Sequence, residues 1–245
     1  MKDSSLIHFF GPDGAGKTTQ VNMLVDFLKK RDVRVRKCWV RSPHTLAYIL
    51  WRFFVKIGFY RVIWNPFGIG IKIPAVDRNR LLRNFWSAIE FFSVLPHIAR
   101  ANVLMFRGHK LVAERYVLDT ITTVAYFIDD INFLRNPLAR VLMRFIPKDA
   151  VLIFVDADFA TILERRKPLF FERKNSLKNP SQKRRKPRVY GYVPNSVVEP
   201  QEFIDFQRKA YKMLAKSLDA FEIYSPQFSV DETFNLILQL VEETN

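Results

Sequence analysis

The sequence predicts an α/β protein, in which a five-stranded parallel sheet lies between two layers of helices. Two observations predict this fold class. Short apolar runs of strand length alternate along the chain with longer segments whose apolar residues recur at helical spacing. Strands that alternate with helices form βαβ units, and the resulting parallel sheet needs helices on both faces. The length of 245 residues suits one such domain.

The first half of the chain opens with a strand, a glycine-rich turn and a helix. Leu6–Phe10 is an apolar run that ends at Gly11, and Lys17–Lys30 places its apolar residues on one helical face. Residues 33–40 alternate apolar residues with Arg and Lys, which is typical of a strand. Helices are then expected over 45–58 and 77–107, the second with a bend at Pro96, and a short strand over 111–114.

The second half of the chain continues this alternation. Residues 151–155 are strongly apolar and predict a buried strand, which leads into a helix over 157–167. Ser229 or Asp231 can cap the final helix. The remaining expected elements are helices over 119–127, 137–145, 202–218 and 231–243 and a short strand over 222–224.

The positive charge is concentrated in one segment. The formal net charge of the chain is +15, and residues 165–190 hold eleven basic residues against Glu172 alone. Prolines interrupt this segment, which indicates an irregular loop. Strongly basic chains often bind nucleic acid or anionic membranes. Here, however, most of the excess charge belongs to a single predicted loop.

Cysteine usage and apolar segments limit the class of protein. Cys38 is the single cysteine, which excludes a disulfide framework and a cysteine-rich metal site. The first residues lack an export signal, so we expect a cytoplasmic location. The longest uncharged stretch in the apolar middle of the chain, 62–71, is too short to span a membrane.

Residues 11–18 carry the most specific motif in the chain. Their sequence, GPDGAGKT, fits G-x-x-x-x-G-K-[ST] between an expected strand and an expected helix. Glycines let backbone N–H groups point at phosphate oxygens, and a helix N-terminus favours the same charge. Lys17 would bridge the β- and γ-phosphates of ATP, and Thr18 would bind Mg²⁺. The alternative is a chance match in a turn. The predicted nucleotide-binding residues are Gly11, Asp13, Gly14, Ala15, Gly16, Lys17, Thr18 and Thr19.

This loop, read as GAGKTTQ with Asp13 inside it, resembles the thymidylate kinase family of nucleoside monophosphate kinases. Two later segments look like further motifs of that family, in the family's order. The segment GHKLVAERY at 108–116 is similar to G-x-x-V-I-x-D-R-Y, with Glu114 in place of Asp. The segment FVDADFATILERR at 154–166 is similar to the strand and helix that lead to the family's mobile LID, and 203–241 is similar to its C-terminal part.

The resemblance implies a P-loop NTPase fold, a three-layer sandwich with a mobile basic LID. It implies one kinase domain over 1–245, with a helical acceptor-side region at 42–107 and a LID insertion at 165–200. The implied activity is ATP-dependent phosphoryl transfer to a nucleoside monophosphate, with dTMP to dTDP as the first candidate, in nucleotide biosynthesis. The implied partners are ATP, Mg²⁺, the phosphorylated acceptor and a second copy of the chain.

Phosphoryl transfer needs two phosphates held in line and their negative charge neutralised, which suggests roles for several charged residues. Glu114, at the end of its strand, would bind Mg²⁺ together with Thr18, and Arg115 would grip the acceptor phosphate. A structural Glu–Arg pair is the alternative. Arg165 aligns with the family's LID arginine, and Arg166 or Arg173 could share its charge-stabilising role. The alternative for each of these arginines is a solvated position on a basic helix.

The acceptor side is less clearly marked. Asp13 and Arg115 are expected to face the acceptor, as is Arg41, which resembles the arginine of the family's R-E-P motif; a plain surface arginine is the alternative. Phe91 or Phe92 could stack on a base, although the arginine that the family places after them is absent. Asp119 could bind an acceptor hydroxyl or simply cap the next helix. The acceptor's identity therefore stays open at this point.

Residues 46–73 are dense in Trp, Phe and Tyr with spaced Arg and Lys. One interpretation is a helical hairpin packed on the core or at a dimer interface. The other is an in-plane membrane helix on anionic lipid. It would suit a related kinase that phosphorylates a lipid-linked or glycan-pathway acceptor at a membrane surface. A third function, a nucleic-acid-binding P-loop protein using 183–188, is disfavoured because no known binding module surrounds these residues.

Overall fold

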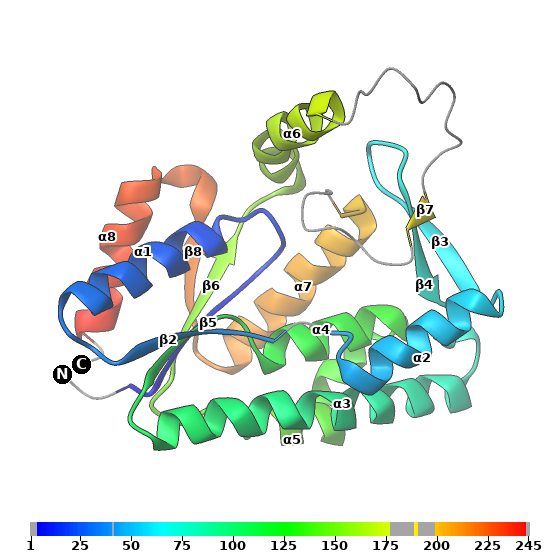
Figure 1. The fold of residues 1–245 in the computed structure, drawn as a ribbon, viewed down its shortest axis with the longest axis horizontal. Helices are drawn as coiled ribbons and strands as arrows, with labels where there is room; N and C mark the ends of the chain where they lie inside the picture. The colour runs from blue at the N-terminus through cyan, green and yellow to red at the C-terminus, as the bar shows by residue number, and fades with distance from the viewer. Residues whose placement is uncertain (1–3, 41, 177–188, 191–198, 244–245) are drawn as a thin grey trace.

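The computed structural model describes residues 4–40, 42–176, 189–190 and 199–243, and these form an α/β fold (Figure 1). A five-stranded parallel sheet is flanked by helices, which confirms the predicted fold class. The order of its strands is β2-β5-β1-β6-β8, so the first strand lies in the centre. The strands are β1 (Leu6–Phe10), β2 (Val35–Trp39), β5 (Lys110–Arg115), β6 (Val151–Asp156) and β8 (Phe221–Tyr224).

Helices cover both faces of this sheet, because side chains alternate between the faces along each buried strand. On one face, Ile7 and Phe9 of β1 pack in an apolar cluster with α1 (Lys17–Lys30) and α8 (Val230–Glu243). On the other face, Leu6 and Phe10 belong to a second cluster. That cluster is covered by α3 (Arg80–Phe106), α4 (Val117–Phe127), α5 (Pro137–Met143) and α7 (Gln201–Ser217).

Two helices begin later than predicted, for the same physical reason: a polar side chain caps the first turn. The Asn79 side chain accepts the N–H of Leu82, so α3 begins at Arg80 and residues Val76–Arg78 form a separate 3₁₀ turn. The Asp158 carboxylate accepts from the backbone N–H of Thr161 at 2.9 Å, and α6 spans Phe159–Ser176. Two further 3₁₀ turns lie at Ile131–Arg135 and Ser225–Gln227.

The helical hairpin expected over 46–73 is wrong in its second half. Helix α2 (Thr45–Lys56) is present, but it is followed by an antiparallel hairpin of β3 (Tyr60–Trp64) and β4 (Gly70–Pro74). The turn between these strands is built by Asn65, whose Oδ1 accepts the N–H groups of Phe67 and Ile69 at 3.0 and 2.8 Å. Short apolar runs do not distinguish a buried strand from a helix by periodicity alone.

The β3–β4 hairpin continues into a small second sheet. The backbone of β7 (Val189–Tyr190) pairs in parallel with Gly70 and Ile71 of β4. The irregular loop expected from residue 165 is wrong over 165–176, because α6 continues to Ser176. Most of the rest of the expected LID, 177–188 and 191–198, lies outside the described residues. Arg41 and the side chain of Arg173 also lie outside the described part of the chain.

Among the described residues, one helix is long and apolar enough to cross a membrane by length and composition. This helix is α3, and 28% of its most apolar window is buried inside the protein. Core helices of soluble proteins pass the same test, so the finding is weak evidence for a span. Helix α3 packs against β5 and α4 and contains Pro96.

Candidate functional site

The glycine-rich loop between β1 and α1 is shaped by close contacts that only glycine permits. Gly11 has a φ of 142°, and a Cβ at this position would lie 2.1 Å from the carbonyl oxygen of Val155 in β6. Gly14 has a φ of 100°, and its Cβ would lie 2.8 Å from the side chain of Ile162 in α6. The loop therefore lies directly against β6 and α6, with its backbone close to the carboxyl edge of the sheet.

Lys17 begins α1 and is folded back over this loop. Its Nζ donates hydrogen bonds of 2.7 Å each to the carbonyl oxygens of Gly11 and Pro12. Burial lowers the pKa of Lys17 to about 8, although the nearby carboxylates of Asp119 and Glu114 act in the opposite direction. The ammonium is thus held inside the loop, where it would face the phosphates of a bound nucleotide.

Thr18 and Glu114 meet at the carboxyl end of β5. The Thr18 hydroxyl donates to Glu114 Oε1, and Lys37 of β2 lies 3.0 Å from Glu114 Oε2. Within the described residues, His, Cys, Asp and Glu side chains form no group of three or more that could hold a metal. A hydroxyl beside one carboxylate suits Mg²⁺, which keeps several waters and takes phosphate oxygens as its other ligands.

Arg115, the last residue of β5, is buried between two carboxylates. One guanidinium nitrogen contacts Asp13 of the glycine-rich loop, and the other donates to Asp119 Oδ1 at 3.0 Å. Asp119 in turn accepts the hydroxyl of Tyr211 at 3.0 Å. Burial acts to raise the pKa of Asp119, but His8 and Arg115 beside it hold the pKa below its ordinary value. The arginine is therefore fixed in orientation by a carboxylate on each side.

Arg165 of α6 is fixed against the back of the glycine-rich loop. Its Nη1 donates to Ser225 Oγ at 2.9 Å and to the carbonyl oxygen of Ala15 at 3.3 Å, and its Nη2 donates to the Ser225 carbonyl at 3.3 Å. Ser225 directly follows β8, so the edge strand positions this guanidinium. Arg166 lines the same space beside the loop. Neither arginine lies on a purely solvated helix face.

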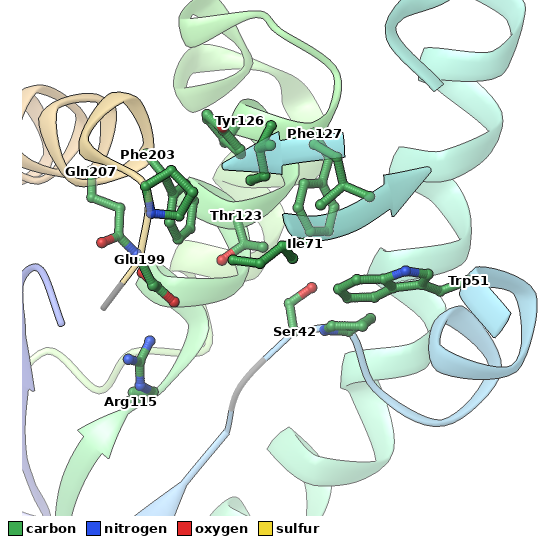
Figure 2. A pocket seen from close by; sticks show the side chains of 14 residues that line it. Ser42, Trp51, Ile71, Arg115, Thr123, Tyr126, Phe127, Glu199, Phe203 and Gln207 are labelled. Carbon is green, nitrogen blue, oxygen red and sulfur yellow. The ribbon is translucent and has the colours of Figure 1, made fainter. Parts of the chain in front are cut away.

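Two cavities meet at Arg115. The phosphate-side cavity, of about 740 Å³, is open, and most of the residues that line it are charged or polar. The acceptor-side cavity is narrow, about 40 Å³, and mostly apolar. Figure 2 shows the Arg115 side chain rising from the end of β5 toward this second cavity. The residues of the phosphate-side cavity are Asp13, Gly14, Gly16, Lys17, Thr18, Thr19, Lys37, Trp39, Glu114, Arg115, Arg165 and Arg166.

The acceptor-side cavity presents aromatic and aliphatic surfaces from α2, the hairpin, α4 and α7 (Figure 2). Trp51 is held by a 3.0 Å hydrogen bond from its Nε1 to the Lys72 carbonyl. Tyr126 donates its hydroxyl to Glu202 at 2.9 Å, so both rings turn their apolar surfaces to the cavity. Gln207 also lines the cavity, and its Oε1 is buried without a hydrogen-bond partner. That oxygen can accept a hydrogen bond from a bound molecule.

Three predicted acceptor residues do not line either cavity. Phe92 is 62% exposed on α3, and Phe91 packs edge-to-face against it at 5.4 Å between ring centres. Asp119 is fully buried behind Arg115 and lines neither cavity. Its carboxylate also lies 3.4 Å from the backbone N–H of Tyr116, at the start of α4. Asp119 thus acts by holding Arg115 and capping α4, rather than by facing a ligand.

Sequence reasoning missed several residues that the fold brings to the site. Lys37 could have been found from the alternation over 33–40, because side chains alternate between the two faces of a strand and this pattern assigns the lysine to one of them. Tyr211 and Ser225 carried no local signal, since each contacts the site only through the tertiary fold. The same holds for Trp51 and Gln207 in the acceptor-side cavity.

No family model matches the chain, and a search of curated proteins finds no significant match. What this site can do therefore has to be judged from its own residues and their geometry.

Proposed function

We propose that the protein transfers the γ-phosphoryl group of ATP to a phosphorylated small molecule, a nucleoside monophosphate with dTMP as the first candidate. One observation carries the proposal: Arg115 lines both the phosphate-side and the acceptor-side cavity. A buried guanidinium between two cavities is suited to hold an acceptor phosphate next to a triphosphate. The motif at residues 11–18 supports ATP as the donor.

The topology supports a P-loop NTPase fold as the finer description of the domain. The chain leaves the central strand β1 to build β2 and β5 on one side of it, and β6 and β8 on the other. In parallel sheets, ligands bind outside the carboxyl ends of strands at such a switch point. The glycine-rich loop and Arg115 both lie at that edge.

The proposed mechanism relies on positioning and charge, because phosphoryl transfer needs little covalent chemistry from the protein. The backbone N–H groups of residues 13–16 and the start of α1 would hold the β- and γ-phosphates, together with Lys17. Arg115 would hold the acceptor phosphate, whose ionised oxygen attacks the γ-phosphorus while the bond to the β-phosphate oxygen breaks. The acceptor oxygen is already an anion, so no general base is required.

The negative charge of the transferred group would be stabilised from two directions. Thr18 and Glu114 would hold Mg²⁺, which neutralises phosphate charge and orients the donor when bound. Arg165 would act from its fixed position against Ala15 and Ser225, and Arg166 from the same side. Lys37 would hold Glu114 in its orientation.

The size of the acceptor-side cavity supports a single-ring acceptor. A volume of about 40 Å³ holds about three water molecules, so even one six-membered ring would have to displace the walls to enter. A fused purine would need the walls to move further. The apolar faces of Trp51 and Phe127 favour a base that carries a methyl group, and Gln207 Oε1 can accept a ring N–H.

The test is ADP release measured in a coupled assay with dTMP, dUMP, CMP, UMP, AMP and GMP. We expect dTMP to stimulate turnover most strongly and the purine nucleotides least. Lys17→Ala is the control for site-specific turnover, since it removes the phosphate-binding ammonium. If no nucleotide stimulates turnover although the protein binds ATP, the nucleotide acceptor is wrong. If ATP does not bind, the whole proposal fails.

A further inference from the structure

Helix α2 turns an apolar stripe to solvent. Leu46, Ile49, Phe53 and Ile57 recur at three- and four-residue spacing, and all are more than half exposed, Ile49 by 65%. The opposite side of the helix is buried through Ala47 and Trp51. The stripe is therefore a continuous surface feature rather than a scatter of single apolar side chains.

Helix α3, which lies beside α2 (Figure 1), carries a second stripe. The two helices are joined where the Ala47 N–H and the Thr45 hydroxyl donate to Ser93, at 3.0 and 3.2 Å. The exposed apolar residues of α3 are Leu81, Phe85, Phe92, Val103 and Phe106. Together with the α2 stripe, these residues are named the α2–α3 face.

The inner side of α3 is held by the domain along most of its length. Trp86, Val94, Ile98 and Ala101 of this helix are buried. Helix α3 therefore stays packed on the fold, and its apolar outer side can contact a membrane surface only if the helix lies parallel to that surface. This excludes a spanning arrangement of α3 in the folded protein and favours an in-plane one.

The charges around the α2–α3 face have one sign. Residues 42–110 hold ten Lys and Arg against two acids. Neither acid offers a free exposed carboxylate, because Asp77 pairs with Arg61 at 2.9 Å and Glu90 is fully buried. The exposed cations on α2 and at the ends and outer side of α3 are Arg52, Lys56, Arg80, Arg100 and Arg107.

We propose that the α2–α3 face docks on an anionic lipid bilayer surface, with both helices in the plane of the headgroups. Apolar and aromatic side chains would enter the headgroup–acyl boundary, while the long basic side chains reach phosphate groups. A second copy of the chain is the less suitable occupant. An interface between two copies would bring together two faces whose helices carry exposed cations and no exposed carboxylate, and Asp130, in a cavity beside Arg80 at the start of α3, would offset only part of this charge. An anionic lipid surface supplies the missing negative charge.

Vesicle co-sedimentation of the full chain tests this proposal. Vesicles of phosphatidylcholine with about 30% phosphatidylglycerol are compared with phosphatidylcholine alone at low salt. The apolar variant is Ile49→Ser/Phe53→Ser, and its control is Phe228→Ser/Val230→Ser, where exposed apolar residues outside the α2–α3 face are changed. The charge variant is Arg52→Glu/Lys56→Glu, and its control is Lys209→Glu/Lys216→Glu on α7, with the same change in net charge.

We expect the chain to bind the anionic vesicles and not the neutral ones. Both face variants should lower the partition coefficient at least about tenfold, and both controls should leave most of the binding. The apolar variant matters most, because the basic residues of 165–190 could bind anionic vesicles by charge alone. If the apolar variant has a lower melting temperature than the wild type, the comparison of the charge variant with its control decides instead.

Three results would overturn the proposal. One is a wild-type chain that does not bind anionic vesicles. Another is equal loss of binding in each face variant and its control, which would assign the binding to overall charge. The third is a dimer by light scattering that Ile49→Ser/Phe53→Ser converts to a monomer without changing vesicle binding, which would assign the face to a second copy.

Discussion

Asp119→Asn tests whether Arg115 owes its position to a buried carboxylate. The substitution keeps the shape of the side chain and removes its charge. Asp119 accepts from Arg115 at 3.0 Å and from Tyr211 at 3.0 Å, with no exposure to solvent. Removing one partner of a buried ion pair costs about 3–5 kcal/mol. We expect the lower end, about 3 kcal/mol, because Asp13 remains beside Arg115 and the amide oxygen of Asn can still accept one hydrogen bond.

The assay has two parts, thermal unfolding at neutral pH and steady-state kinetics. A loss of about 3 kcal/mol should lower the melting temperature by about 6–12 °C in a protein of this size. The kcat/KM for the acceptor should fall at least about tenfold, because Arg115 is no longer held in its productive orientation. The KM for ATP should rise by less than the kcat/KM for the acceptor falls, because Asp119 does not line the phosphate-side cavity and acts on ATP only through its attraction for the Lys17 ammonium.

Asp130→Asn is the matched control. Asp130 caps a 3₁₀ turn by accepting the N–H of Asn132 at 2.9 Å, and asparagine caps equally well. This variant should unfold within about 0.5 kcal/mol of the wild type. Equal stability of Asp119→Asn and Asp130→Asn, or an unchanged kcat/KM for the acceptor, would refute the role assigned to Asp119.

The remaining predictions concern four other residues. Lys17→Ala should abolish phosphoryl transfer while the melting temperature stays near that of the wild type, and retained turnover would contradict its role in the loop. Because the pKa of Lys17 is lowered to about 8, ATP affinity measured by titration calorimetry should fall as pH rises through that value, and a flat profile would show that its ammonium is not needed. Gly11→Ala should weaken ATP binding and lower the melting temperature, since its Cβ would lie 2.1 Å from the Val155 carbonyl; unchanged binding would mean that the loop can move away from β6. Arg165→Ala should lower kcat more than it raises the KM for ATP, whereas an equal effect on the two would indicate a binding role only. Burial raises the pKa of Glu90 to about 8, so the folded state keeps the proton where the unfolded chain has lost it, and stability should fall as pH rises from about 5 to 8. Glu90→Gln should flatten that decline in urea unfolding, and an unaltered decline would exclude Glu90 as its source.

The fold class could be predicted because each layer leaves a periodic signal in the sequence. The run Leu6–Phe10 is buried along its whole length, as a central strand must be, and Lys17–Lys30 has the expected bounds. The β3–β4 hairpin could not be predicted in the same way. Its aromatic and β-branched residues fit a helix or a strand equally well, and the decisive contacts come from the side chain of Asn65 within the turn.

The residues of the candidate site also differ in whether the sequence could indicate them. The residues of the glycine-rich loop form one contiguous motif, and Glu114 and Arg115 lie together at the end of a strand. Local sequence patterns could therefore indicate both groups. The groups that orient them are distant in sequence: Tyr211 lies 92 residues from Asp119, and Ser225 lies 60 residues from Arg165. Phe91 and Phe92 show the converse error, because none of the residues that line the acceptor-side cavity comes from α3, and nothing local in the sequence indicates this.

The pairing of Arg115 with Asp13 gives the two substrates of the proposed reaction a way to affect one another. Before an acceptor arrives, two carboxylates already neutralise the arginine, and one of them belongs to the loop that would hold ATP. A phosphate that binds Arg115 must compete with Asp13, and the released carboxylate changes the charge of the loop around the donor. In the proposed reaction, acceptor occupancy would thereby be communicated to the nucleotide through a single side chain, which would disfavour wasteful hydrolysis of ATP when no acceptor is bound.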